Sequence, residues 1–265
     1  MAENLFDRIT WEVVEGVARI TLARPSAGNS LDQPMGMALR KAADRLSKGA
    51  ATGEIRVGVL AAEGKVFSVG GDLREFAGAD DRGAQVQATA DELHAGIATL
   101  RSLEIPLVSV LHGTAAGGGL GVALAADIVL AAAEAKLVMA YTASGLTPDC
   151  GLTWVIPQRV SWARAMDLAL MNRVLTGEEA AQWGLISRAV PAVDLQSEVD
   201  RIVSALRDGS GTAFSGAKRL MAQSATRTMA EEMDVEAATI REVIAAPDGV
   251  EGVNAFLEKR TPVYR

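Results

Sequence analysis

Two glycine-rich turns are the places where this chain's backbone could do chemistry. The first is Val69-Gly70-Gly71-Asp72 and the second is Gly117-Gly118-Gly119, and each follows a short apolar run typical of a buried strand. Glycine lets the backbone approach a ligand closely and lets an N–H point outward. The second turn also opens a helix of small residues, whose N-terminal dipole favours negative charge. Two N–H groups aimed at one oxygen would form an oxyanion hole, whereas either turn alone could be a plain tight turn.

Several other kinds of chemistry lack the residues they need. The glycines at 117–121 do not fit G-x-G-x-x-G, because Val122 and Leu124 occupy the third glycine position of its two registers. No G-x-S-x-G sequence is present. The chain has two histidines, His94 and His112, and one cysteine, Cys150, which is little material for a zinc site or a Cys–His dyad. The residues favour metal-free chemistry that uses no histidine as a base.

The elements that must position these turns alternate along the first half of the chain. Residues 9–14 and 17–22 predict a hairpin, and residues 57–61, 106–111 and 128–132 predict buried strands. We expect a helix capped by Asp32 and running to about Ser47, a second over 89–102, and a loop with some helix over 74–88. From about Thr153 onward the chain is expected to be almost entirely helical. This order indicates an α/β fold with a parallel core.

Composition limits the classes of partner. The 265 residues are 49% hydrophobic and 22% charged, enough for a sizeable core, and the net charge of −7 argues against a nucleic-acid surface. The most apolar stretch, 108–133, is interrupted by His112 and Asp127, so no membrane span is expected. The N-terminus lacks the apolar segment of a signal peptide, and a lone cysteine suits a reducing compartment. We therefore expect a cytoplasmic protein.

Seven ordered segments, spread over most of the chain, together resemble the crotonase superfamily, also called the enoyl-CoA hydratase/isomerase family. They are Leu22–Pro25 with Asn29–Leu31, Phe67–Leu73, His112–Gly119, Ala126–Ile128, Gly145–Asp149, Leu175–Gly177 with Ala180 and Trp183–Leu185, and Ala255–Arg260.

The resemblance implies a spiral core of ββα units over residues 1–200 and a C-terminal helical region over 201–265 that forms trimers. It implies an acyl-CoA thioester as substrate, a homotrimer or dimer of trimers as the assembly, and no cofactor or metal beyond the coenzyme A of the substrate. The family's two oxyanion-hole donors correspond to the N–H groups of Gly71 and Gly118. Polarising the thioester carbonyl there would stabilise an enolate.

The resemblance also bears on the catalytic carboxylate. Hydratases of the family use two glutamates, and these positions hold Gly121 and Tyr141 here. Neither can be a carboxylate base, since tyrosine has an ordinary pKa near 10. Dienoyl-CoA and ring-1,2-epoxyphenylacetyl-CoA isomerases carry a catalytic aspartate where this chain has Asp149, and the segment Leu146–Trp154 is especially similar to the latter group. We therefore expect an acyl-CoA isomerase with Asp149 as its acid/base.

Other readings of Asp149 stay open. Some relatives use an aspartate in this region as a nucleophile, for dehalogenation or hydrolysis of a CoA-bound group. An enoyl-CoA hydratase-like lyase and a non-catalytic acyl-CoA binder are further alternatives. Asp149 could also be the N-cap of a helix that begins before Thr153.

The remaining expected site residues bind the substrate. Arg24, Val69 and Leu73 resemble positions along the CoA path, and Asp72 is counted with them because it should fix the turn through hydrogen bonds. Tyr141 and Trp154 are expected to border an apolar acyl pocket. Lys259 corresponds to a lysine that reaches the CoA phosphates, sometimes from a neighbouring subunit. We assign no catalytic role to His94, His112 or Cys150.

Overall fold

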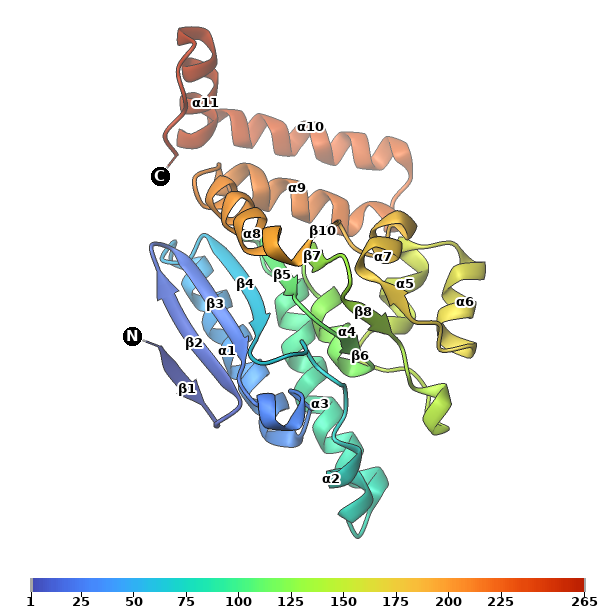
Figure 1. The fold of residues 1–265 in the computed structure, drawn as a ribbon. Coiled ribbons are helices and arrows are strands. Elements are labelled where there is room, and N and C mark those ends of the chain that lie inside the picture. The colour runs from blue at the N-terminus through green and yellow to red at the C-terminus, as the bar shows by residue number, and fades with distance from the viewer. Residues whose placement is uncertain (1, 265) are drawn as a thin grey trace.

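The computed structural model describes residues 2–264 and mixes strands and helices along the chain (Figure 1). Seven strands form one sheet in the order β1-β2-β3-β4-β5-β7-β10, and three short strands form a second in the order β6-β8-β9. From β3 to β10, neighbouring strands of the large sheet are parallel. The predicted α/β class with a parallel core is confirmed.

The strands of the large sheet are β1 (Glu3–Leu5), β2 (Ile9–Val14), β3 (Val17–Leu22), β4 (Val57–Ala62), β5 (Leu107–Leu111), β7 (Ile128–Ala132) and β10 (Arg188–Val190). Those of the small sheet are β6 (Ala115–Ala116), β8 (Lys136–Val138) and β9 (Leu175–Thr176). The α-helices are α1 (Gln33–Ala51), α2 (Leu73–Gly78), α3 (Arg82–Arg101), α4 (Gly118–Leu124), α5 (Leu152–Arg159), α6 (Trp162–Leu170), α7 (Gly177–Trp183), α8 (Ala192–Arg207), α9 (Gly211–Gln223), α10 (Met229–Ala245) and α11 (Pro247–Glu258). Short 3-10 helices are η1 (Pro25–Ala27), η2 (Thr142–Ser144) and η3 (Ser224–Thr226).

The predicted hairpin is present at the start of the large sheet. β2 and β3 pair from Ile9↔Leu22 to Val14↔Val17, which leaves only Glu15 and Gly16 in the turn. Both turn residues have positive φ, 48° and 77°, as expected for a two-residue turn whose twist matches its strands. β1 then pairs with β2 and extends the antiparallel edge.

The expected strands and first helix form the core that carries the glycine turns. β4, β5 and β7 appear where they were predicted, and their residues are almost all buried. The Asp32 carboxylate accepts the Met35 N–H at 2.9 Å and caps α1, as expected, although the helix extends past Ser47 to Ala51. α1 and α3 pack together along their length.

Two expectations about secondary structure were confirmed only in part. Residues 82–88 are helical, because Asp81 caps α3 by accepting the Ala84 N–H at 2.9 Å. That end of the helix is largely exposed, so it has no apolar period for the sequence to display. The C-terminal half also contains β9 and β10, and β10 completes the large sheet by pairing with β7. Strands of two or three residues are too short to show a periodicity.

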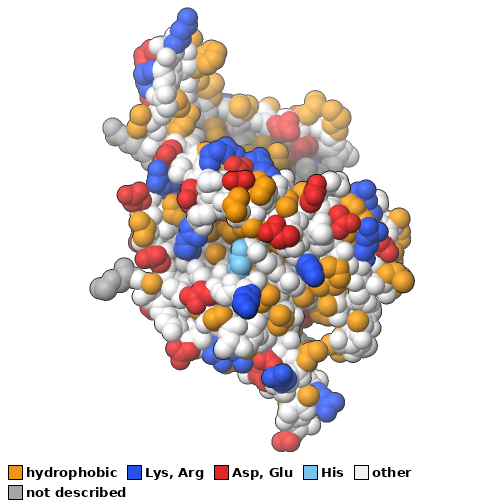
Figure 2. All heavy atoms as spheres, in the orientation of Figure 1, with side chains coloured by type: hydrophobic (Ala, Val, Ile, Leu, Met, Phe, Trp, Pro, Cys, Tyr) orange, Lys and Arg blue, Asp and Glu red, His pale blue; other side chains and the backbone are white. Residues whose placement is uncertain are grey.

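The last three helices form an arm that rises from the rest of the molecule, with α10 and α11 farthest out (Figure 1). Hydrophobic side chains are visible on the surface of the arm in Figure 2. The large apolar residues that the arm and the segment after it expose are Met221, Met229, Met233, Ile240, Ile244, Val250, Val253, Phe256, Leu257 and Val263. The predicted helical C-terminal region is therefore present, and the proposed boundary at residue 200 lies inside α8. No helix within residues 2–264 is both long and apolar enough to cross a membrane.

Candidate active site

The first glycine turn is held by backbone on both of its edges. Leu31 donates its N–H to the Gly70 carbonyl at 2.8 Å, and the Leu31 carbonyl accepts the Asp72 N–H at 3.1 Å. Just upstream, Ser68 pairs with Ala115 on the other edge. The Gly70 carbonyl and the Gly71 N–H belong to one trans peptide, so they point in opposite directions. The Gly71 N–H therefore points away from Leu31.

The second turn leads directly into α4. Gly117 has φ 52° and ψ −131°, a conformation in which a side chain would be strained, and its N–H donates to the Val138 carbonyl at 3.1 Å. Gly118 is the first residue of the helix, so it has no acceptor for its N–H within α4. α4 has only seven residues, so the helix dipole expected at its N-terminus is weak.

The two turns lie against each other. A Cβ on Gly70 would stand 3.4 Å from the Gly118 nitrogen and 2.9 Å from the Ala116 oxygen, and one on Gly117 would stand 3.6 Å from the Gly70 Cα. Gly70 has φ 91°, which also favours glycine. Within residues 2–264, neither the Gly71 nor the Gly118 N–H donates a hydrogen bond to a protein acceptor. Two adjacent turns thus each present a free peptide N–H.

Asp149 lies next to this pair of turns and is held by Tyr141. The Tyr141 hydroxyl donates a short hydrogen bond to Asp149 Oδ1. A Cβ on Gly118 would stand 3.7 Å from the Tyr141 hydroxyl oxygen, which places the phenol beside the second turn. α5 is capped by Gly151, without any side-chain hydrogen bond, so the reading of Asp149 as a helix N-cap was wrong.

His94 reaches the same carboxylate from α3, and the sequence did not indicate this. Its Nε2 lies 3.9 Å from Asp149 Oδ2 and accepts the Cys150 N–H at 3.2 Å. Accepting that N–H requires an unprotonated Nε2, which places the proton of the neutral imidazole on Nδ1. His94 is 55 positions from Asp149 in the chain, and helical spacing alone could not have shown which loop its face of α3 meets.

Electrostatics leave Asp149 as the group suited to moving a proton. Burial, reinforced by the nearby Cys150 and Asp149, raises the pKa of Tyr141 well above its ordinary value. Burial also raises the pKa of the Cys150 thiol. Both groups therefore keep their protons at neutral pH, and Tyr141 acts as a hydrogen-bond donor.

The position of the first hydratase glutamate has no room for a side chain. A Cβ on Gly121 would stand 2.5 Å from the Cys150 Cβ and 2.6 Å from the Cys150 oxygen. Contacts this close are far inside van der Waals distance, so any longer side chain would have to displace the segment that carries Asp149. Cys150 itself has φ 51°, an uncommon value for a residue other than glycine.

Arg24 and Asp72 stabilise the first glycine turn through hydrogen bonds of their side chains. One Arg24 guanidinium nitrogen lies 2.8 Å from Asp72 Oδ2, 2.9 Å from the Ser30 hydroxyl and 3.0 Å from Asp32 Oδ2. Burial alone would raise the pKa of Asp72, but hydrogen bonds from Arg24, the Glu75 N–H and Ser30 outweigh it and lower the pKa. Asp72 also caps α2, so it fixes the turn as expected.

Val69 and Leu73 are open to a ligand at the outer side of this turn. Their exposed fractions are 48% and 51%, large for apolar side chains. Lys259, by contrast, is the C-cap of α11 in the arm. Figure 1 shows that α11 lies at the opposite end of the molecule from α2 and well away from α4. The structure of one chain thus brings Gly71, Gly118, Tyr141 and Asp149 together and leaves Lys259 apart.

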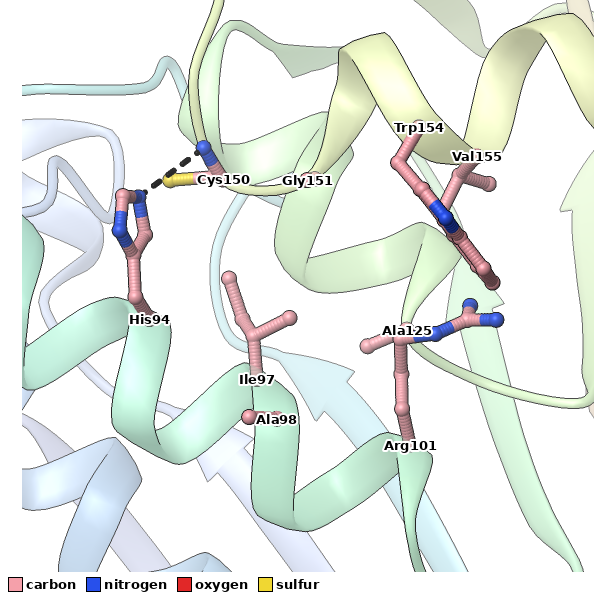
Figure 3. Close-up of a pocket in the computed structure, with 10 residues that line it drawn as sticks. His94, Ile97, Ala98, Arg101, Ala125, Cys150, Gly151, Trp154 and Val155 are labelled. Atoms are coloured by element: carbon pink, nitrogen blue, oxygen red, sulfur yellow. Dashed lines mark hydrogen bonds between the residues drawn. The ribbon is translucent and has the colours of Figure 1, made fainter.

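A cavity of about 430 Å³ opens beside Asp149, between α3, α4 and the start of α5 (Figure 3). Its walls are mainly apolar: His94, Ile97, Ala98, Arg101, Gly121, Ala125, Cys150, Gly151, Trp154 and Val155. Trp154 lines it as expected, whereas Tyr141 lies on the other side of Cys150, towards the glycine turns.

Comparison with known proteins identifies the family. The family model for enoyl-CoA hydratase/isomerase matches residues 12–265. A "Probable enoyl-CoA hydratase" of Rhodobacter capsulatus is 36% identical over 260 residues, covering 98% of both chains. The 1,2-epoxyphenylacetyl-CoA isomerase of Escherichia coli is 33% identical over 265 residues, covering 98% of this chain and 99% of the relative.

A solved structure extends the likeness to the fold. An enoyl-CoA hydratase from Polaromonas sp. JS666 superposes with a TM-score of 0.90 at 30% identity, over 97% of this chain and 100% of that one. Both the resemblance drawn from the motifs and the crotonase-like fold are confirmed. The chain belongs to the enoyl-CoA hydratase/isomerase family.

Proposed function

We propose that this protein is an acyl-CoA isomerase that moves a double bond, or rearranges a CoA-bound ring, through a thioester enolate. The Gly71 and Gly118 N–H groups bind the thioester oxygen, and Asp149 carries the proton. The support for the first part is that two neighbouring turns present peptide N–H groups with no internal acceptor. Donors fixed in this way lower the energy of a developing oxyanion without having to reorganise.

The proton balance of a double-bond shift needs one carboxylate. Asp149 takes a proton from the α-carbon of a 3-enoyl thioester, and the electron pair moves through the carbonyl to give a dienolate with its charge on the thioester oxygen. The neutral Asp149 then returns the proton to the γ-carbon, and the double bond settles between the α- and β-carbons. No water is consumed and no cofactor other than the substrate's coenzyme A takes part.

The observation that carries isomerisation over hydration is the contact between Gly121 and Cys150. Hydration in this family needs a second carboxylate, and a Cβ at position 121 would stand 2.5 Å from the Cys150 Cβ. The other hydratase position holds Tyr141, whose proton is kept by burial and whose hydroxyl is bound to Asp149. The proposed site therefore offers one carboxylate, Asp149, whereas hydration would need two.

The test is a panel of 3-enoyl, dienoyl and aryl-epoxide CoA thioesters with wild type and Asp149→Asn. We expect wild type to isomerise at least one of these substrates and Asp149→Asn to lose about 10²–10⁴ of that rate, the usual contribution of a positioned acid/base. Asp167→Asn is the matched control, because the Asp167 side chain has the same exposed fraction as that of Asp149, 37%, and lies on α6. Efficient hydration of crotonyl-CoA by wild type would contradict the proposal.

A second candidate function follows from the position of His94. Asp149 Oδ1 is bound by Tyr141, whereas Oδ2 lies 3.9 Å from Nε2 of His94, a residue that lines the cavity. On a CoA-bound ring, Asp149 could displace a leaving group and form an aryl ester. After releasing the Cys150 N–H, His94 Nε2 could then take a proton from water, whose attack on the ester carbonyl would return the free carboxylate and a hydroxylated ring.

Mass spectrometry separates the two candidates. A ring thioester with a leaving group, reacted with His94→Gln and quenched early, would leave a covalent mass on the peptide that holds Asp149 if the carboxylate is a nucleophile. Isomerisation never forms such a bond, so an unmodified peptide together with a shifted double bond supports the first proposal.

We further propose that the arm joins copies of this chain into trimers, alone or paired. Its support is the row of exposed apolar side chains on α10 and α11, which include Phe256 at 81% and Met229 at 80% exposure. In such an assembly Lys259 could reach the CoA phosphates of a neighbouring subunit. Light scattering of wild type against Phe256→Glu would test the assembly, since a monomeric wild type would overturn it.

A further inference from the structure

The cavity beside Asp149 is polar at both of its ends and apolar between them. In Figure 3, His94 and Cys150 lie at one end, and Arg101 and Trp154 lie at the other. Ile97 and the remaining lining residues supply the apolar walls between. His94 Nε2 lies 3.9 Å from Asp149 Oδ2, so the first end adjoins the proposed acid/base, although Asp149 itself is not among the lining residues.

Arg101 at the far end is exposed to solvent and has hydrogen-bond donors that no protein group within residues 2–264 accepts. Its guanidinium stacks on the Trp154 ring at 4.7 Å, an arrangement that leaves the N–H groups around its edge free. Desolvation lowers the pKa of Arg101, and the Asp127 carboxylate opposes that effect from nearby. That carboxylate is already committed to Lys218 at 2.6 Å. No acceptor within residues 2–264 takes a hydrogen bond from Arg101.

A second arginine–tryptophan stack in the same chain provides the contrast. Arg164 lies over the Trp183 ring at the same 4.7 Å, yet it also donates to the Trp183 carbonyl at 3.4 Å and lines no part of the cavity. Stacking on tryptophan therefore does not by itself leave an arginine without an acceptor. The difference at Arg101 is that its free edge stands at a cavity wall.

Helix geometry gives the distance between the two ends. His94 and Arg101 are seven positions apart on α3, so they lie on the same face about two turns apart. At about 1.5 Å per residue, this separation is about 10 Å along the helix axis. A linear acyl chain of medium length, or a ring with a substituent opposite its thioester arm, spans such a distance.

We infer that the preferred substrate is a CoA thioester whose acyl group ends in a carboxylate, bound by Arg101 at the far end of this cavity. The inference rests on the proposed acyl-CoA site and adds the class of acyl group. The apolar walls would pack on the middle of the chain, while the guanidinium edge would receive the carboxylate through paired hydrogen bonds.

Binding of saturated CoA thioesters tests this without requiring turnover. The probes are two series of graded length, one ending in a methyl group and one in a carboxylate, with acetyl-CoA as the reference, measured by calorimetry. We expect wild type to bind a carboxylate-ended ester of matching length about tenfold or more tightly than its methyl-ended partner. Arg101→Met should abolish this preference while leaving acetyl-CoA binding unchanged, and Arg101→Lys should restore part of it. Arg164→Met is the control and should change nothing.

Other outcomes would overturn the inference. Wild type binding methyl-ended esters as well as, or better than, carboxylate-ended ones would do so even if Arg101→Met failed to fold. An equal loss of acetyl-CoA binding in Arg101→Met would assign Arg101 to the CoA portion or to the fold. A carboxylate preference in a protein that isomerises nothing would keep this inference and reject the proposed reaction. Isomerisation without any such preference would do the reverse.

Discussion

The two halves of the site are built in different ways. The half proposed to bind the thioester oxygen is backbone: two glycine turns, each encoded by a short contiguous stretch, brought together because Ser68 and Ala115 pair as parallel neighbours. The half proposed to face the acyl chain is made of side chains, in which Tyr141, Asp149 and His94 come from a 3-10 helix cap, a loop and α3. Only the second half contains titratable groups near the reacting carbons.

This difference separates what every reaction of the site would share from what selects one reaction. Peptide N–H groups can stabilise an enolate whichever carbon loses its proton, so the glycine half does not determine which reaction takes place. The carboxylate half decides whether a proton is shuttled, water is added or a covalent bond forms. Gly121, whose missing side chain makes room for Cys150, lies where the two halves meet.

Apart from the loss of Asp149 itself, the largest effect should come from breaking the backbone half. Gly70→Ala places a Cβ 2.9 Å from the Ala116 oxygen and 3.4 Å from the Gly118 nitrogen, which should push the two turns apart. We expect isomerase turnover to fall about 10²–10³-fold, as when one oxyanion donor is lost. The loss should appear with every thioester that the wild type accepts, because this half does not depend on the acyl group.

Gly53→Ala is the matched control for this change. Gly53 also has a positive φ, 76°, but a Cβ there meets nothing within 4 Å. It therefore carries the backbone strain of Gly70→Ala without the clash, and it should lower the melting temperature while sparing turnover. Equal losses of turnover in both variants would mean that Gly70 acts through stability and not through the turns.

The same contrast explains how far the sequence could predict the molecule. The hairpin, α1 with its Asp32 cap, the buried strands and both glycine turns were predictable, because each is encoded within a few consecutive residues. Asp149 could be named only through the family resemblance. The Asp149–His94 contact could not be predicted, since it depends on how α3 packs beside the loop before α5. β10 was missed because its three residues belong to the sheet only through pairing with β7.

An intermediate effect should come from His94, and it sharpens the side-chain half. His94→Ala leaves the Cys150 N–H without its acceptor and loosens the segment that carries Asp149. We expect about a tenfold fall in kcat with little change in KM for short 3-enoyl thioesters, because the CoA contacts lie elsewhere. His94→Gln, whose side-chain carbonyl can accept the same N–H, should recover part of the rate.

The histidine control is His112→Gln. His112 Nε2 lies 3.0 Å from the Gly64 carbonyl, away from the cavity, so its loss should leave kcat unchanged. If His94→Ala stops turnover after one covalent event and His94→Gln rescues nothing, His94 acts on water and the nucleophilic function is the correct one.

The smallest effect should come from Tyr141→Phe, which removes a single donor from Asp149 while keeping the ring. The charged carboxylate loses a hydrogen bond that stabilises it, so turnover should fall slightly. The rate at the plateau of the pH–rate profile should fall by only about threefold to tenfold, which corresponds to one hydrogen bond of ordinary net strength, about 1 kcal/mol. Tyr264→Phe, at the far end of the chain, is the control and should leave the profile in place.

Because burial raises the pKa of Tyr141, its phenol should stay protonated past its ordinary value of about 10, so wild type should show no loss of rate from tyrosine ionisation below that pH. A loss near neutral pH that Tyr141→Phe abolishes would make the phenol a proton carrier, and the side-chain half would then hold two titrating groups instead of one.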